Sequence, residues 1–206
     1  MKIMKIKLHI CALLAFLTIT SAFSQDALFR SIPYLKGIQI KNLSQDPNGY
    51  VWFATDNGLY RYDGYETKRY LIDDNRSSDN SIQTVYADNS GLIWFSSIFS
   101  GLHCLDTKTG TFKHFSNKPN DLNSLSSTTI NSILKDKKGI LWVGTSDGLN
   151  RLEDMNTGKF TRFQHDNNKL YSLSNDDVNV LYEDKKGILW VGTKGGLNRF
   201  DPTNEQ

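Results

Sequence analysis

The sequence is poor in cysteine, and this limits how the fold can be stabilised. It has two cysteines in 206 residues, Cys11 and Cys104. Cys11 lies in a segment that we expect to be removed on export, which leaves Cys104 without a partner in the chain. No intramolecular disulfide is therefore expected, even in an exported setting where disulfides form. Stability must come from packing.

An excess of charge of one sign is also lacking. The formal net charge is +2, and loss of Lys2, Lys5 and Lys7 with an export signal changes it to −1. A balance so close to neutrality gives no electrostatic reason to expect binding to nucleic acid or to an anionic membrane surface. We predict no nucleic-acid partner for this segment.

The chain also lacks a hydrophobic run long enough for a membrane span. The apolar run near its start, residues 8–20, is shorter than the roughly 20 apolar residues that a membrane-spanning helix needs. It follows three lysines and precedes the small-residue exit SAFSQ, which is the pattern of a secretory signal peptide. We predict that residues 1–24 are removed and that the mature chain, residues 25–206, is exported to the periplasm.

Residues with catalytic or metal-binding spacing are missing too. His103, His114 and His165 are not spaced as metal ligands, and lone histidines are more often structural or solvated. The pairs Asp73–Asp74 and Asp176–Asp177 do not fit the calcium loop of an EF-hand and are interpreted as solvated loop acids. The sequence therefore predicts no catalytic residue, no metal site and no cofactor.

What the chain does contain is a repeat. GILWVGTSDGLNRL begins at Gly139 and GILWVGTKGGLNRF begins at Gly187, while looser copies begin at Gly49 and Gly91. All four tryptophans occupy one position of this repeat, with spacings of 42, 48 and 48 residues: Trp52, Trp94, Trp142 and Trp190. Self-similarity at such a period indicates a solenoid or a propeller.

Each repeat contains the elements of β-hairpins. An apolar stretch leads to Asp-x-x-Gly, where aspartate and glycine favour a turn, at Asp46–Gly49, Asp88–Gly91, Asp136–Gly139 and Asp184–Gly187. The strand that follows is apolar on both faces, so it is expected to be buried on both sides. A second glycine turn leads to a more polar third strand, and segments such as KFTRF, with Phe160 and Phe163, form a fourth.

These features predict an all-β protein made of propeller blades. Each blade has four antiparallel strands with the innermost the most apolar, and the tryptophans pack between blades. The blades are expected near residues 37–72, 82–115, 129–163 and 177–206, with the last incomplete. Four blades of a larger ring would leave two apolar end faces exposed, so we also expect self-association. Turn glycines and the lack of a long 3.6-residue period exclude a helical repeat.

The segments that begin at Gly139 and Gly187 resemble the two-component regulator propeller repeat. The opening of the sensor region of hybrid two-component histidine kinases is similar to two other segments of this chain, ALFRSIPYLKGIQI and DPNGYVWFATDNGLYRYDGY. The resemblance covers nearly all of the mature chain. It implies propellers of seven blades, followed by an immunoglobulin-like module, a membrane helix, and kinase and regulator domains. This chain has four repeats and no kinase histidine box, so the resemblance implies the amino-terminal part of a sensor anchored in the inner membrane.

The expected ligand face follows from propeller geometry. Loops between second and third strands, and loops between blades, surround one mouth of the central channel. In the second repeat, the loop between the second and third strands, within SSIFSG, is one residue longer than in the other repeats. The longer loop places an aromatic side chain at its tip. The candidate ligand-binding residues are Asp56, Asn57, Phe99, Asp147 and Lys194 on the first set of loops and Arg76 on the second.

Three functions remain open at this point. The resemblance favours a periplasmic sensor region that binds an oligosaccharide or another small ligand and signals to a kinase, with the remaining blades and the kinase part as partners. A secreted propeller enzyme, lyase-like or glycosidase-like, would need acids, histidine or arginine gathered at the channel mouth, which these repeats do not supply. An interaction scaffold would bind protein without responding to sugars. We expect this chain not to be an enzyme.

Overall fold

The structure is a computed structural model that describes residues 30–71, 80–98 and 100–200. Contacts divide the chain into residues 1–33 and residues 34–206, and all the strands lie in the second unit. The predicted signal peptide, Arg76 and Phe99 lie outside the described residues. Within these ranges, no helix is long and apolar enough to cross a membrane.

In the described part of the chain, fifteen strands form four antiparallel sheets, each built from strands consecutive in the chain. The first two sheets contain β1 (Ile40–Gln45), β2 (Val51–Thr55), β3 (Gly58–Tyr62) and β4 (Thr67–Tyr70), then β5 (Ile82–Ala87), β6 (Leu92–Ser97), β7 (Gly101–Asp106) and β8 (Phe112–Phe115). The last two contain β9 (Ile130–Lys135), β10 (Leu141–Thr145), β11 (Gly148–Asp154) and β12 (Lys159–Phe163), then β13 (Val178–Glu183), β14 (Leu189–Thr193) and β15 (Gly196–Phe200).

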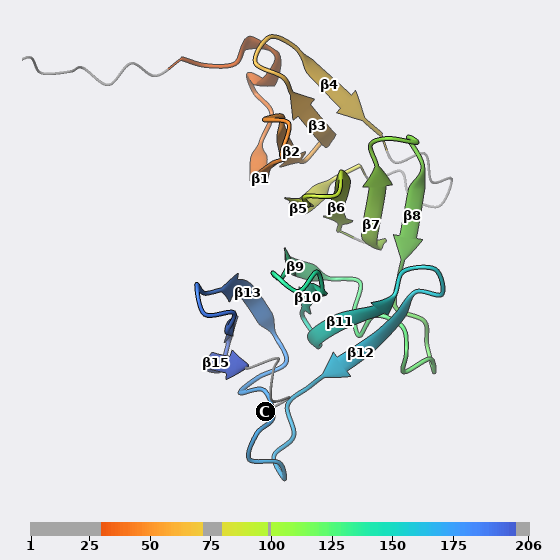
Figure 1. The fold of residues 1–206 in the computed structure, drawn as a ribbon, viewed down its shortest axis with the longest axis vertical. Coiled ribbons are helices and arrows are strands. Elements are labelled where there is room, and N and C mark those ends of the chain that lie inside the picture. The colour runs from red at the N-terminus through yellow and green to blue at the C-terminus, as the bar shows by residue number, and fades with distance from the viewer. Residues whose placement is uncertain (1–29, 72–79, 99, 201–206) are drawn as a thin grey trace, which may run out of the picture. The chain divides into compact units, whose positions relative to one another are not determined.

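The all-β propeller prediction is confirmed. Successive sheets pack on one another in chain order, and the first strand of each contacts the first strand of the next, β1 to β5, β5 to β9 and β9 to β13 (Figure 1). Each sheet is therefore a blade, and the four blades form an open part of a propeller. Among the described residues the fourth blade has three strands. A 3-10 helix, η1 (Pro33–Leu35), precedes β1.

Three hydrophobic clusters fill the spaces between consecutive blades. Each contains the tryptophan of the earlier blade: Trp52 between the first and second, Trp94 between the second and third, and Trp142 between the third and fourth. These three rings are at most 2% exposed, which confirms the predicted core role. Trp190 is only partly buried, because no further blade covers it among the described residues.

One expectation about strand polarity is wrong. The innermost strands are not the most buried: in the third blade, β9 is buried at two of its six residues, Ile130 and Ile133, whereas β10 is buried throughout. The reason is that a second strand lies between two blades, while a first strand has one side toward the channel. In the first and third blades the third strand is more exposed than the second, as expected, although its first residues, such as Leu59 and Leu149, are buried against the next blade.

Candidate functional site

The turn aspartates do more than shape the hairpins. In every blade, one carboxylate oxygen accepts backbone hydrogen bonds from the residues two and four positions on, and the other accepts a bond from the tryptophan Nε1. The Nε1 to Oδ2 distances are 2.9 Å for Trp52–Asp46, 3.4 Å for Trp94–Asp88, 2.9 Å for Trp142–Asp136 and 3.1 Å for Trp190–Asp184. The predicted structural role of these aspartates is confirmed, and the link to tryptophan was missed.

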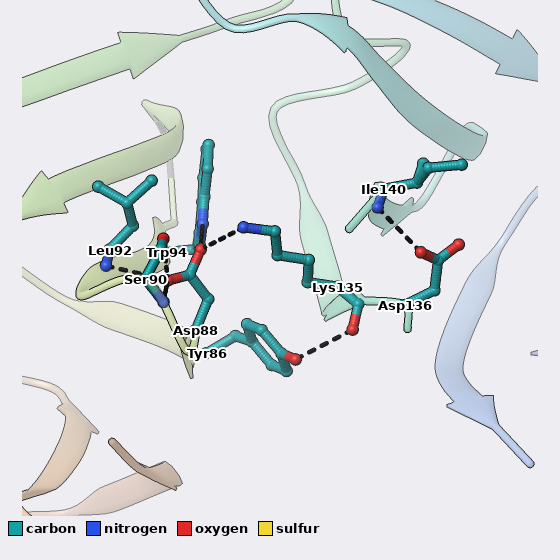
Figure 2. A network of polar contacts seen from close by, with 8 residues as sticks. All are labelled: Tyr86, Asp88, Ser90, Leu92, Trp94, Lys135, Asp136 and Ile140. Carbon is teal, nitrogen blue, oxygen red and sulfur yellow. Dashed lines mark hydrogen bonds and ion pairs between the residues drawn. The ribbon is translucent and has the colours of Figure 1, made fainter. Parts of the chain in front are cut away.

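One aspartate also joins two blades. Figure 2 shows Lys135 of β9 reaching Asp88 of the second blade, with its Nζ 2.7 Å from Oδ2, while the Tyr86 hydroxyl donates to the Lys135 carbonyl at 3.1 Å. Burial of Asp88 acts to raise its pKa, but Lys135, Ser90 and the backbone NH of Leu92 stabilise the carboxylate and hold its pKa below the ordinary value. This end of the blades is thus occupied by structural contacts.

The opposite end of the blades is where the ligand face was expected. There, in the second, third and fourth blades, the turn between the second and third strands donates a backbone hydrogen bond to the loop that enters the same blade. The pairs are Ile98 to Ser81 at 3.2 Å, Ser146 to Thr129 at 3.0 Å and Lys194 to Asp177 at 3.0 Å. In each of these three blades, the turn and the entering loop are therefore joined at this end.

Four of the six sequence-predicted ligand residues lie on these turns and are exposed: Asp56, Asn57, Asp147 and Lys194. The carbonyl oxygen of Asn57 accepts from Arg69 Nε at 2.7 Å, and Lys194 pairs with Asp177 at 2.6 Å, which raises the pKa of Lys194. Each side chain lies on the turn of its own blade, and none of the four lines the groove described next.

A feature that the sequence reasoning missed is a β-bulge at one position of every first strand. In each case one residue is skipped in the pairing with the second strand, and the skipped residues are Lys41, Gln83, Asn131 and Asn179. Their spacings of 42, 48 and 48 residues match those of the tryptophans. That match could have flagged the position, because all four residues are polar within strands that otherwise begin Ile or Val.

Three of the bulged side chains border one groove of about 470 Å³. The groove brings together the first strands of the second, third and fourth blades with one turn and one connecting loop. Its lining is Gln83, Asn131 and Asn179 together with Ser97, Ile98, Thr128, Thr129 and Ile130. Of these described residues none is charged, so the groove presents amides, hydroxyls and methyl groups on the expected ligand face.

The remaining candidate side chains have structural surroundings. His103 is buried, stacks on Phe95 and His114, and lies 2.8 Å from the Ser100 hydroxyl. Burial raises the pKa of the Cys104 thiol to about 12, so it stays protonated at neutral pH. No cluster of three metal-ligating side chains occurs among the described residues. The groove is therefore the best candidate site.

Comparison with protein families supports the repeat assignment. Residues 34–57, 124–147 and 172–195 match the family described as two component regulator propeller. The matched segments include the tryptophan strands of the first, third and fourth blades. No curated protein matches the chain. The chain carries two-component regulator propeller repeats.

Solved structures give the same fold. The extracellular domain assigned to the hybrid two-component system BT3049 of B. thetaiotaomicron is 26% identical with a TM-score of 0.56, and the match covers 82% of this chain and 29% of that one. The extracellular domain assigned to the hybrid two-component system BT4673 of the same organism is 26% identical with a TM-score of 0.65, and the match covers 82% of this chain and 23% of that one. Virginiamycin B lyase of Staphylococcus aureus shares the fold. It is 16% identical with a TM-score of 0.56, and the match covers 80% of this chain and 56% of that one. This chain thus spans about a quarter of the length of the two-component relatives.

Proposed function

We propose that this chain is the amino-terminal, ligand-sensing part of a hybrid two-component sensor histidine kinase. The observation that carries the proposal is the match of three repeats to the two-component regulator propeller, together with 26% identity to extracellular domains of such systems over 82% of the chain. The kinase, the membrane helix and the remaining blades belong to the parent protein in this proposal, since the chain spans only a fraction of its relatives.

The role of this part is binding rather than catalysis. The described residues that line the groove on the turn-and-loop face offer amides, hydroxyls and methyl groups, and none of them is an acid, a histidine or an arginine that could act as a proton donor or acceptor. Groups of that kind can orient a small polar molecule. The proposed ligand is an oligosaccharide or a related small molecule.

The proposed location is the periplasm, with the parent protein anchored in the inner membrane. The signal-peptide pattern of residues 1–24 and the extracellular origin of the two-component relatives support it. We expect the exported protein to begin at Gln25, since SAFSQ provides a small-residue cleavage site. Mass spectrometry of the periplasmic fraction checks this, and a protein that retains Met1 would contradict it.

The direct test of the sensor assignment is the gene beyond codon 206. The proposal expects the reading frame to continue into further propeller repeats, a membrane helix and a histidine kinase. A frame that ends without a kinase would overturn the sensor assignment. A reporter fused to a promoter that the full-length protein controls then shows whether polysaccharide breakdown products activate it.

A further inference from the structure

We propose that the groove binds an uncharged, polyhydroxylated ligand, such as a neutral oligosaccharide, through the bulged amides Gln83, Asn131 and Asn179. The inference rests on the proposed sensor function and narrows its ligand to one chemical class. It also moves the binding residues from the exposed turns to the first strands of three consecutive blades.

The bulges direct these side chains toward the groove. A bulge leaves one residue out of the ladder and re-aims its side chain, and bulges are common beside functional sites. Here the same position is bulged in all four blades, and in three of them the residue is an amide that borders the groove. Because the bulge and the amide recur together in consecutive blades, the groove is bordered by a series of similar polar side chains.

These amides have hydrogen-bonding capacity available for a ligand. Gln83 and Asn179 are exposed, and their side chains make no hydrogen bond to another described residue. Asn131 donates its amide NH₂ to the Val178 carbonyl at 2.9 Å and to Asp177 Oδ1 at 3.3 Å, while its side-chain oxygen makes no such bond. Gln83 and Asn179 can each donate and accept, and Asn131 can accept through its side-chain oxygen, which matches the hydroxyls of a sugar.

The described lining of the groove offers no ion-pair partner to a charged ligand. A carboxylated or sulfated sugar is normally held by arginine or lysine, and neither is among the described residues that line the groove. The fourth bulged residue, Lys41, is not part of the lining, and its Nζ donates to the Ser81 hydroxyl at 2.6 Å. The adjacent acid, Asp177, is paired with Lys194. Ile98, which is partly exposed, offers apolar surface to the C–H face of a sugar ring.

The experiment uses the full chain, isotopically labelled, and two panels of probes. One panel holds short neutral oligosaccharides of glucose, galactose, mannose and arabinose, and the other holds uronic-acid and sulfated oligosaccharides. Titration calorimetry measures affinity, and NMR follows the side-chain NH₂ signals. The variants are Gln83→Ala with Asn179→Ala, and the control is Asn89→Ala, which removes an exposed amide at the far end of the same hairpin.

A neutral oligosaccharide is expected to bind and to shift the NH₂ signals of Gln83 and Asn179. The double variant should bind about tenfold or more weakly, since two hydrogen bonds are lost, and the control should bind unchanged. If the double variant does not fold, the near-isosteric Gln83→Glu with Asn179→Asp replaces it and should weaken binding as well.

Two results would overturn the inference while leaving the sensor assignment intact. One is neutral-sugar binding that the groove variants do not change, and the other is binding of the charged panel alone. Failure of every sugar in both panels would overturn the inference together with the oligosaccharide part of the proposed function. The sensor assignment is then judged separately, by the reading frame beyond codon 206.

Discussion

The third and fourth blades carry almost the same sequence from Gly139 and from Gly187, and their surroundings differ. Both form the same hairpin: Trp142 pairs with Arg151 and Trp190 with Arg199 in the same register. Leu149 is 1% exposed in the third blade, whereas the equivalent Leu197 is 67% exposed in the fourth. The local sequence therefore determines the strands and turns, and the neighbouring blade determines the burial.

Polar contacts follow the local sequence in the same way. The side-chain oxygen of Asn150 accepts from the Ser126 backbone NH at 2.9 Å, and that of Asn198 accepts from Ser174 at the same distance. Asn150 is fully buried, but Asn198 is only partly buried. The asparagine thus makes this hydrogen bond with or without a further blade beside it. Hydrogen bonding within a repeat depends on the local sequence, whereas burial depends on the neighbouring repeat.

The tryptophans provide the largest expected difference between the two blades. Trp142→Ala should lower the free energy of unfolding by about 3–5 kcal/mol, because the ring is buried against Phe163 and Phe200. Trp190→Ala should cost about 1 kcal/mol, since water already reaches that ring. Denaturant unfolding of both variants measures the difference. Equal losses would mean that a neighbour also covers Trp190.

The paired leucines isolate burial without an aromatic ring or a hydrogen bond. Leu149→Ala should destabilise by about 2–5 kcal/mol, because Leu149 packs in the cluster between the third and fourth blades. Leu197→Ala should stay within about 0.5 kcal/mol of the wild type. The same unfolding experiment decides between them. A large cost at Leu197 would contradict the account.

Two lysines extend the comparison to ion pairs. Lys135→Met should cost about 2 kcal/mol at neutral pH, because the Asp88 side chain is 1% exposed and loses a charged donor. Lys194→Met should not change the melting temperature, because Lys194 is 71% exposed in its pair with Asp177.

The pH dependence of the first ion pair has a definite sign. The pKa of Asp88 is lowered in the folded state, so its contribution is complete above about pH 4, the ordinary aspartate value, and is lost as pH falls through the lowered pKa. The stability gap between wild type and Lys135→Met should therefore narrow in acid. A gap that widens in acid would exclude Asp88 as the source of the effect.

Much of the fold could be predicted because it depends on local chemistry. The turn glycines, such as Gly139 at φ 85° and Gly148 at φ 112°, hold the positive φ that their turns require. The bond from aspartate to tryptophan was missed, because it spans six residues across a hairpin whose register the sequence does not state. The groove was missed for a similar reason: bulges depend on register, and the lining comes from three blades.

Among the described residues, no neighbour covers the outer face of the fourth blade, whereas the next blade covers the equivalent face of each of the other three. Val180, Tyr182 and Leu197 are 57%, 60% and 67% exposed there, while Ile40 and Leu43 are exposed on the first blade. Two such faces can meet between copies of the chain, so we expect self-association. Introducing Val180→Lys with Leu197→Lys should prevent it.

Size-exclusion chromatography with light scattering, run over a range of concentrations, tests this claim most directly. The account predicts a molar mass that rises with concentration for the wild type and stays at that of one chain for the double-lysine variant. A wild type that remains monomeric at every concentration, with elution and melting indistinguishable from the variant, would contradict it.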